Sequence, residues 1–104
     1  MKNIIVLITA ADEKEARKIA CRLIRGRLAA CVNIIPNVNS FFWWQGKIDN
    51  AKEVLLIAKT KLSAFKKIIT LVKRLHSYQV PEIIALPIIA GEKKYLEWLN
   101  DSVR

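Results

Sequence analysis

The side chains best suited to chemistry lie close together in one short segment, LHSYQVPEI, residues 75–83. This segment holds an imidazole (His76), a phenol (Tyr78) and a carboxylate (Glu82), and it includes Pro81, which fixes the backbone. A histidine side chain can bind a metal ion, and it titrates near neutral pH. A carboxylate at the start of an apolar strand is costly unless it is paired. We therefore take this segment as the candidate site.

Each of these residues also has a structural interpretation. His76 can complement the C-terminal end of a helix, and Tyr78 can anchor the loop that follows. Glu82 can form an ion pair with Lys59, which ends another apolar segment. The sequence alone leaves the functional and the structural interpretations open.

The cysteines indicate no known motif, because Cys21 and Cys31 lie ten residues apart and form no CxxC pair. We expect Cys21 to be a small buried hydrophobe on a helix, whereas Cys31, in an apolar strand, is open to either role. Two cysteines are too few for a disulfide framework and favour a reducing, cytoplasmic setting. The chain has no nucleophile elbow, phosphate loop, dinucleotide fingerprint or HExxH motif, so we expect no enzyme.

The hydrophobic periodicity predicts how these residues are positioned. Strands are expected at 3–9, 28–48, 53–60 and 82–89, and helices follow Asp12 and Ser63, with a short last helix around 95–99. Asp12 is the expected N-cap of the first helix, with Glu15 three residues later. With right-handed crossovers, this order predicts one domain, residues 1–104, with an α+β ferredoxin-like βαββαβ sandwich fold, a long β-hairpin and a short C-terminal helix.

The hairpin is too long for such a domain. About twenty residues at roughly 3.3 Å each span on the order of 60 Å, whereas a domain of this length is only about 33 Å across. We place its turn at Asp49–Asn50, with Phe42, Trp44 and Ile48 on one face and Phe41 and Trp43 on the other. Exposed aromatic side chains on both faces indicate packing on other copies of the chain. The alternative is a strand broken at Pro36 within a single domain.

The formal net charge of +9 does not by itself indicate a partner, because Lys and Arg are scattered along the chain. We expect a solvated cationic surface, no specific nucleic-acid binding and no membrane span. An RNA-binding module of the same fold needs aromatics on its central strands, and IIVLIT and EVLLIAKT have none. An acylphosphatase-like enzyme needs an anion-binding loop after the first strand. In this sequence that loop is ITAADEKEA, which is acidic, so we do not expect such an enzyme.

These motifs together resemble the CutA family of divalent-cation tolerance proteins, nearly from end to end. The resemblance rests on LAACVNIIP at 28–36, on Ser40, Trp44 and Gly46 within SFFWWQGKI, on EVLLIAKT at 53–60, on HSYQVPEI at 76–83 and on YLEWL at 95–99. One departure is Phe42, where the family usually carries Tyr. The missing hydroxyl removes one hydrogen bond.

The resemblance implies a homotrimer in which long hairpins pair between subunits, an architecture similar to that of nitrogen-regulatory signal-transduction trimers. It also implies binding of Cu²⁺ or another divalent cation without enzymatic activity. The hairpin aromatics that we expect at the trimer interface are Phe41, Phe42, Trp43 and Trp44. By position, the site in clefts between subunits would use His76, Glu82 and Cys31 on the metal, with Lys59 and Tyr78 beside it. Imidazole and carboxylate suit Cu(II), and thiolate suits Cu(I).

Overall fold

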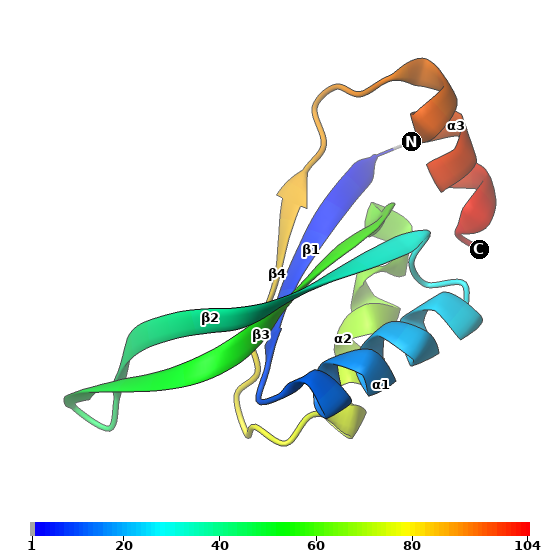
Figure 1. The fold of residues 1–104 in the computed structure, drawn as a ribbon. Coiled ribbons are helices and arrows are strands. Elements are labelled where there is room, and N and C mark those ends of the chain that lie inside the picture. Colours follow the sequence, from blue (N-terminus) through cyan, green and yellow to red (C-terminus); the bar gives the residue numbers. More distant parts are fainter. Residues whose placement is uncertain (1) are drawn as a thin grey trace.

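An antiparallel sheet with strand order β2-β3-β1-β4 organises the molecule, and two of its three helices lie on one face of that sheet (Figure 1). The structure is a computed structural model and describes residues 2–104. The strands are β1 (Asn3–Ala10), β2 (Cys31–Trp44), β3 (Lys47–Lys61) and β4 (Ile83–Pro87). The helices are α1 (Glu13–Arg25), α2 (Phe65–Leu75, after a 3-10 turn at Leu62–Ala64) and α3 (Lys93–Ser102). The α+β ferredoxin-like fold is therefore confirmed.

The core lies between the sheet and the helices α1 and α2. Along β1, alternate side chains point into it, because successive residues of a strand face opposite sides of the sheet. The fully buried large side chains of this core are Val6, Ile8 and Leu56 from the sheet, Ile19 and Leu23 from α1, and Ile68 and Val72 from α2. Their burial is the main source of stability for the domain.

Helix α1 begins as the sequence predicts. The Asp12 side chain accepts a hydrogen bond from the Glu15 backbone N–H at 2.8 Å. The Glu15 carboxylate reaches back to the backbone N–H of Ala11 at 3.0 Å. The two side chains thus satisfy backbone donors at the helix entrance.

Strand β2 is continuous, so it is not broken into two short strands. A β-bulge interrupts the β2–β3 register between Ile35 and Val38, at Pro36 and Asn37, and Asn37 has φ 61°. Strand β1 pairs with β3 only over Val54–Lys61, so the outer half of the hairpin has no third strand. This outer half extends away from the body (Figure 1), and the molecule measures 44 × 25 × 23 Å.

The hairpin turn lies at Gln45–Gly46, so our prediction of Asp49–Asn50 is wrong. Gln45 has φ 51° and Gly46 has φ 77°, as a two-residue hairpin turn requires. Strand β3 therefore begins at Lys47, and Ile48 pairs with Trp43. Directly paired residues share a face, so Ile48 lies beside Trp43 rather than beside Trp44.

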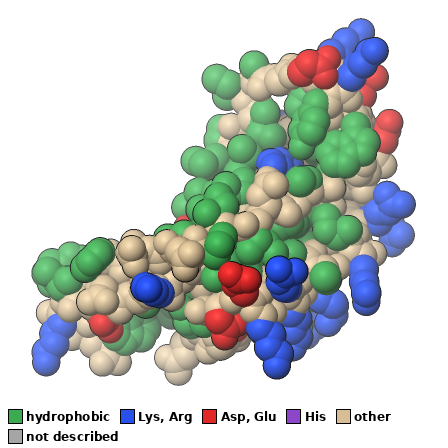
Figure 2. Space-filling model, viewed as in Figure 1, with side chains coloured by type: hydrophobic (Ala, Val, Ile, Leu, Met, Phe, Trp, Pro, Cys, Tyr) green, Lys and Arg blue, Asp and Glu red, His purple; other side chains and the backbone are tan. Residues whose placement is uncertain are grey.

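The second face of the sheet, which we call the open sheet face, has no helix over it and is largely apolar. The strand registers place Ile5, Leu7, Leu55, Ile57, Ile84 and Leu86 on it. Ile84 is 50% exposed and Leu86 is 48% exposed. Figure 2 shows hydrophobic side chains along this side and at the hairpin end, whereas Lys and Arg gather over α1. An apolar surface of this extent is typical of an interaction site.

Helix α3 lies against β3 near the end of the chain, as the sequence predicts. Its Leu99 is fully buried, and Lys61 donates to the Asn100 carbonyl oxygen at 3.2 Å. Among residues 2–104, no helix combines the length and the hydropathy that crossing a bilayer requires.

Leu56→Ala should lower the free energy of unfolding by about 2–5 kcal/mol, because it leaves a cavity in the core on the central strand β3. Leu62→Ala is the matched control, since Leu62 is 45% exposed and its truncation should cost only about 0.5 kcal/mol. Guanidinium unfolding at one fixed chain concentration measures both changes. Equal losses in the two variants would contradict this assignment of the core.

Candidate functional site

His76 caps the C-terminal end of α2, and its side chain has no solvent exposure. Its Nε2 lies 2.6 Å from the Thr9 carbonyl oxygen, which can only accept a hydrogen bond, so Nε2 carries the proton. Its Nδ1 accepts a hydrogen bond from the Tyr78 backbone N–H at 3.0 Å. Both ring nitrogens are thus occupied in the neutral imidazole. A metal ion at His76 would have to displace one of these partners.

Glu15 holds the segment after His76 in place, in addition to its role at the start of α1. Its Oε2 accepts from the Ser77 backbone N–H at 2.9 Å, and its Oε1 lies 3.6 Å from His76 Nδ1. Burial opposes ionisation, but the hydrogen bonds from Ala11 and Ser77 outweigh it and lower the pKa of Glu15. No sequence pattern indicates this second role, because Glu15 and Ser77 lie 62 positions apart and only the fold brings them together.

Tyr78 anchors the loop to the sheet, as its structural interpretation proposed. Its hydroxyl donates to Glu53 Oε2 at 2.9 Å, and its ring lies 4.7 Å from the His76 ring between centroids. Burial, together with the hydrogen bond and the charge of Glu53, raises the pKa of Tyr78 to about 12. Glu53 itself is only 8% exposed. Nothing in the sequence distinguishes Glu53 from any other first residue of a predicted strand.

The predicted ion pair between Lys59 and Glu82 does not form. Lys59 Nζ instead donates to Asn33 Oδ1 and lies 3.8 Å from Cys31 Sγ. The register explains this: Lys59 pairs with Ile5, whereas Glu82 immediately precedes Ile83, which pairs with Ile8. Burial, followed by the Glu53 carboxylate, raises the pKa of Glu82.

One chain therefore divides the predicted site residues into two groups. Cys31 and Lys59 lie directly opposite each other. The second group, His76, Tyr78 and Glu82, lies beyond the other end of the β1–β4 ladder. The two levels are four residues apart along β1, from Ile5 to Thr9, or roughly 13 Å along the strand. Within residues 2–104, no three His, Cys, Asp or Glu side chains come together in a way that could hold a metal ion. Cys21 is exposed on α1, so its prediction as a buried hydrophobe is wrong.

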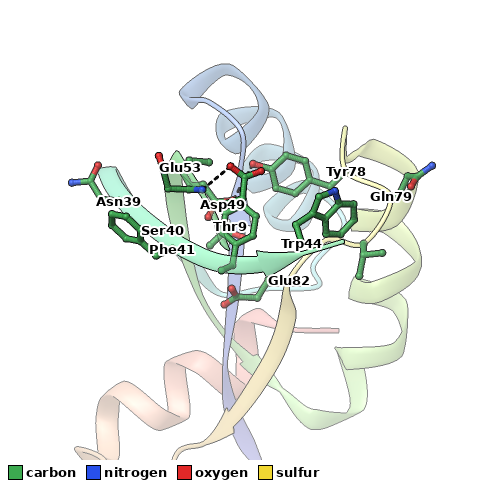
Figure 3. A pocket seen from close by; sticks show the side chains of 14 residues that line it. Thr9, Asn39, Ser40, Phe41, Trp44, Asp49, Glu53, Tyr78, Gln79 and Glu82 are labelled. Atoms are coloured by element: carbon green, nitrogen blue, oxygen red, sulfur yellow. Dashed lines mark hydrogen bonds between the residues drawn. The ribbon is translucent and has the colours of Figure 1, made fainter. Parts of the chain in front are cut away.

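Tyr78 and Glu82 line a pocket of about 750 Å³ between the outer hairpin and the loop before β4 (Figure 3). We call it the acidic pocket, because its walls carry the carboxylates of Asp49, Glu53 and Glu82. The remaining wall residues are Thr9, Asn39, Ser40, Phe41, Phe42, Trp44, Asn50, Ala51, Gln79 and Val80. Phe41, Phe42 and Trp44, three of the four predicted interface aromatics, thus line this pocket, whereas Trp43 does not.

Comparison with known proteins places this geometry in a family. Residues 4–102 match the model of the CutA1 divalent ion tolerance protein. A divalent-cation tolerance protein CutA from Thermus thermophilus is 50% identical over 98 residues, which cover 94% of this chain and 95% of the relative.

Two solved structures agree with the fold over nearly the whole chain. The divalent cation tolerance protein Cut A1 of Thermus thermophilus has a TM-score of 0.96 at 48% identity, covering 98% of this chain and 99% of that one. CutA1 from Oryza sativa has a TM-score of 0.97 at 44% identity, covering 100% of this chain and 95% of that one. The resemblance seen in the sequence motifs is confirmed, and the chain belongs to the CutA1 divalent ion tolerance protein family.

Proposed function

We propose that this chain works as a cytoplasmic homotrimer that binds Cu²⁺ or another divalent cation, and that it is not an enzyme. The observation that supports this best is the outer half of the β2–β3 hairpin, which no third strand covers. The family's name, divalent-cation tolerance, supports the class of ligand. The two free cysteines support the reducing setting.

Self-association follows from the exposed aromatics. Phe41 is 76% exposed, Trp43 73% and Ile48 68%, all on one face of the hairpin, while Phe42 and Trp44 are 38% and 44% exposed on the other. An isolated two-stranded ribbon is marginally stable in water. Packing against other copies would cover both faces and would also bury the apolar open sheet face.

An intersubunit metal site is consistent with the division of the candidate ligands. Cys31 and Glu82 belong to opposite ends of the open sheet face of one chain, so a second chain seated there would bring its own ligands close to them. A site assembled in this way would reach a ligand number that one chain does not supply. His76 would join it only by releasing the Tyr78 N–H or the Thr9 carbonyl.

Light scattering at micromolar concentration should give about three times the chain mass of 11.9 kDa. Trp44→Ala should weaken the assembly, because truncating an aromatic buried at an interface costs roughly 3–5 kcal/mol. Trp98→Ala is the matched control, since Trp98 on α3 is 46% exposed, close to the 44% of Trp44. A monomeric parent, or equal effects of the two substitutions, would contradict the proposal.

Calorimetry of the chelator-treated protein should show Cu²⁺ binding that Glu82→Gln and His76→Ala each weaken. The loss of affinity should exceed the roughly 10–100-fold that follows from mutating a residue that only hydrogen-bonds to a metal ligand. The affinity should fall in mild acid, because a ligating imidazole must be neutral. Cys31→Ser should affect Cu(I) binding under reducing conditions, with Cys21→Ser as its control. Parent-like affinity in folded His76→Ala would assign His76 a purely structural role.

A further inference from the structure

We propose that the acidic pocket binds a small organic cation, specifically an elongated aliphatic polyamine. The inference goes beyond the proposed metal binding, because the charges that it uses all come from one chain and it requires no bound metal. The pocket is open between β2, β3 and the loop at residues 78–82 (Figure 3).

The charge of the pocket is opposite to that of the chain. The sequence carries 18 Lys and Arg against nine Asp and Glu, yet the pocket is lined by three carboxylates and by no Lys, Arg or His. Clustered carboxylates attract cations locally even when the whole molecule is basic. The ligand that fits this electrostatic environment is positively charged.

Glu53 is the most buried of the three carboxylates that line the pocket. It is 8% exposed, and within residues 2–104 its carboxylate forms no ion pair and has Tyr78 as its one hydrogen-bond partner, through Oε2. A buried carboxylate is costly when no positive charge compensates it. Glu82 lines the same pocket, and its charge repels that of Glu53. A cation bound between the two would relieve both effects.

The shape and the walls favour an organic amine over a lone metal ion. The pocket volume of about 750 Å³ lies within the range of small-molecule sites. Asp49 and Glu53 are four residues apart on β3, roughly 13 Å along the strand, which suits several amines along one chain. Phe42, Trp44 and Tyr78 supply apolar surface for the methylenes and ring faces for the ammonium groups.

The proposed trimer is compatible with this pocket. The carboxylates belong to β3 and to the residue before β4, whereas the aromatic side chains from β2 are those that we propose contact other copies. The three carboxylates that would bind the amine therefore all come from one chain.

Titration calorimetry of the assembled, chelator-treated protein with spermidine, 1,4-diaminobutane and 1,4-butanediol tests the proposal at one ionic strength. Spermidine should bind most tightly and the neutral diol should not bind. Glu53→Gln and Glu82→Gln should each weaken spermidine by about tenfold or more, the usual effect of losing a hydrogen bond to a charged group. Gln at position 53 can still accept from Tyr78, so the loop keeps its anchor.

Glu97→Gln is the matched control, because it removes the same charge from an exposed position on α3 and should leave spermidine affinity unchanged. Equal losses in Glu82→Gln and Glu97→Gln, or no spermidine binding by a protein of intact mass, would overturn the inference. So would a crystal structure in which a Lys or Arg of another copy fills the pocket. Copper binding is measured on the same samples, so a failure of the amine proposal is separable from a failure of the metal proposal.

Discussion

The rest of the molecule depends on the unequal pairing of β3. Its inner half is held between β1 and β2, and its outer half pairs with β2 alone. The ladder with β1 ends at Val54, so Glu53 stands where a multi-stranded sheet becomes a two-stranded ribbon. Its carboxylate is therefore buried against Tyr78 and yet lines an open pocket. The same transition creates the long hairpin, so the exposed aromatics and the acidic pocket have one structural cause.

Polar groups that lie far apart in the sequence hold the loop that carries Tyr78 and Glu82 in place. His76 binds the Thr9 carbonyl and the Tyr78 N–H, and Glu15 accepts from Ser77. These bonds join the end of β1, the start of α1 and the exit of α2. Because buried polar groups are costly when unpaired, a network that satisfies all of them has one preferred arrangement. The imidazole thus positions the pocket wall even where it touches no ligand.

The fold was predictable because its elements carry strong local signals. Asp12 caps α1 as predicted, and the buried residues of α1 recur at helical spacing: Ala16, Ile19, Ala20 and Leu23. The position of the hairpin turn was not predictable, since Asp49–Asn50 and Gln45–Gly46 are both acceptable turn pairs. The choice between them depends on the register in which the aromatic residues of β2 pair with β3. Alternation likewise indicated the face of Lys59 and Glu82 but not their separation along the strands. Glu53 was missed because its hydrogen-bond partner, Tyr78, is 25 residues away in the sequence.

The separation of charge in the molecule connects its basic composition with a cation-binding role. Lys and Arg gather over α1 (Figure 2), on the helical layer, and the pocket carboxylates lie on the side of the hairpin and the open sheet face. At physiological ionic strength, exposed charges act over about 8 Å, so the helical cations contribute little potential inside the pocket. Assembly through the open sheet face would leave α1 and α2 outside. The cationic surface would then keep the particle soluble, while the carboxylates determine what enters the pocket.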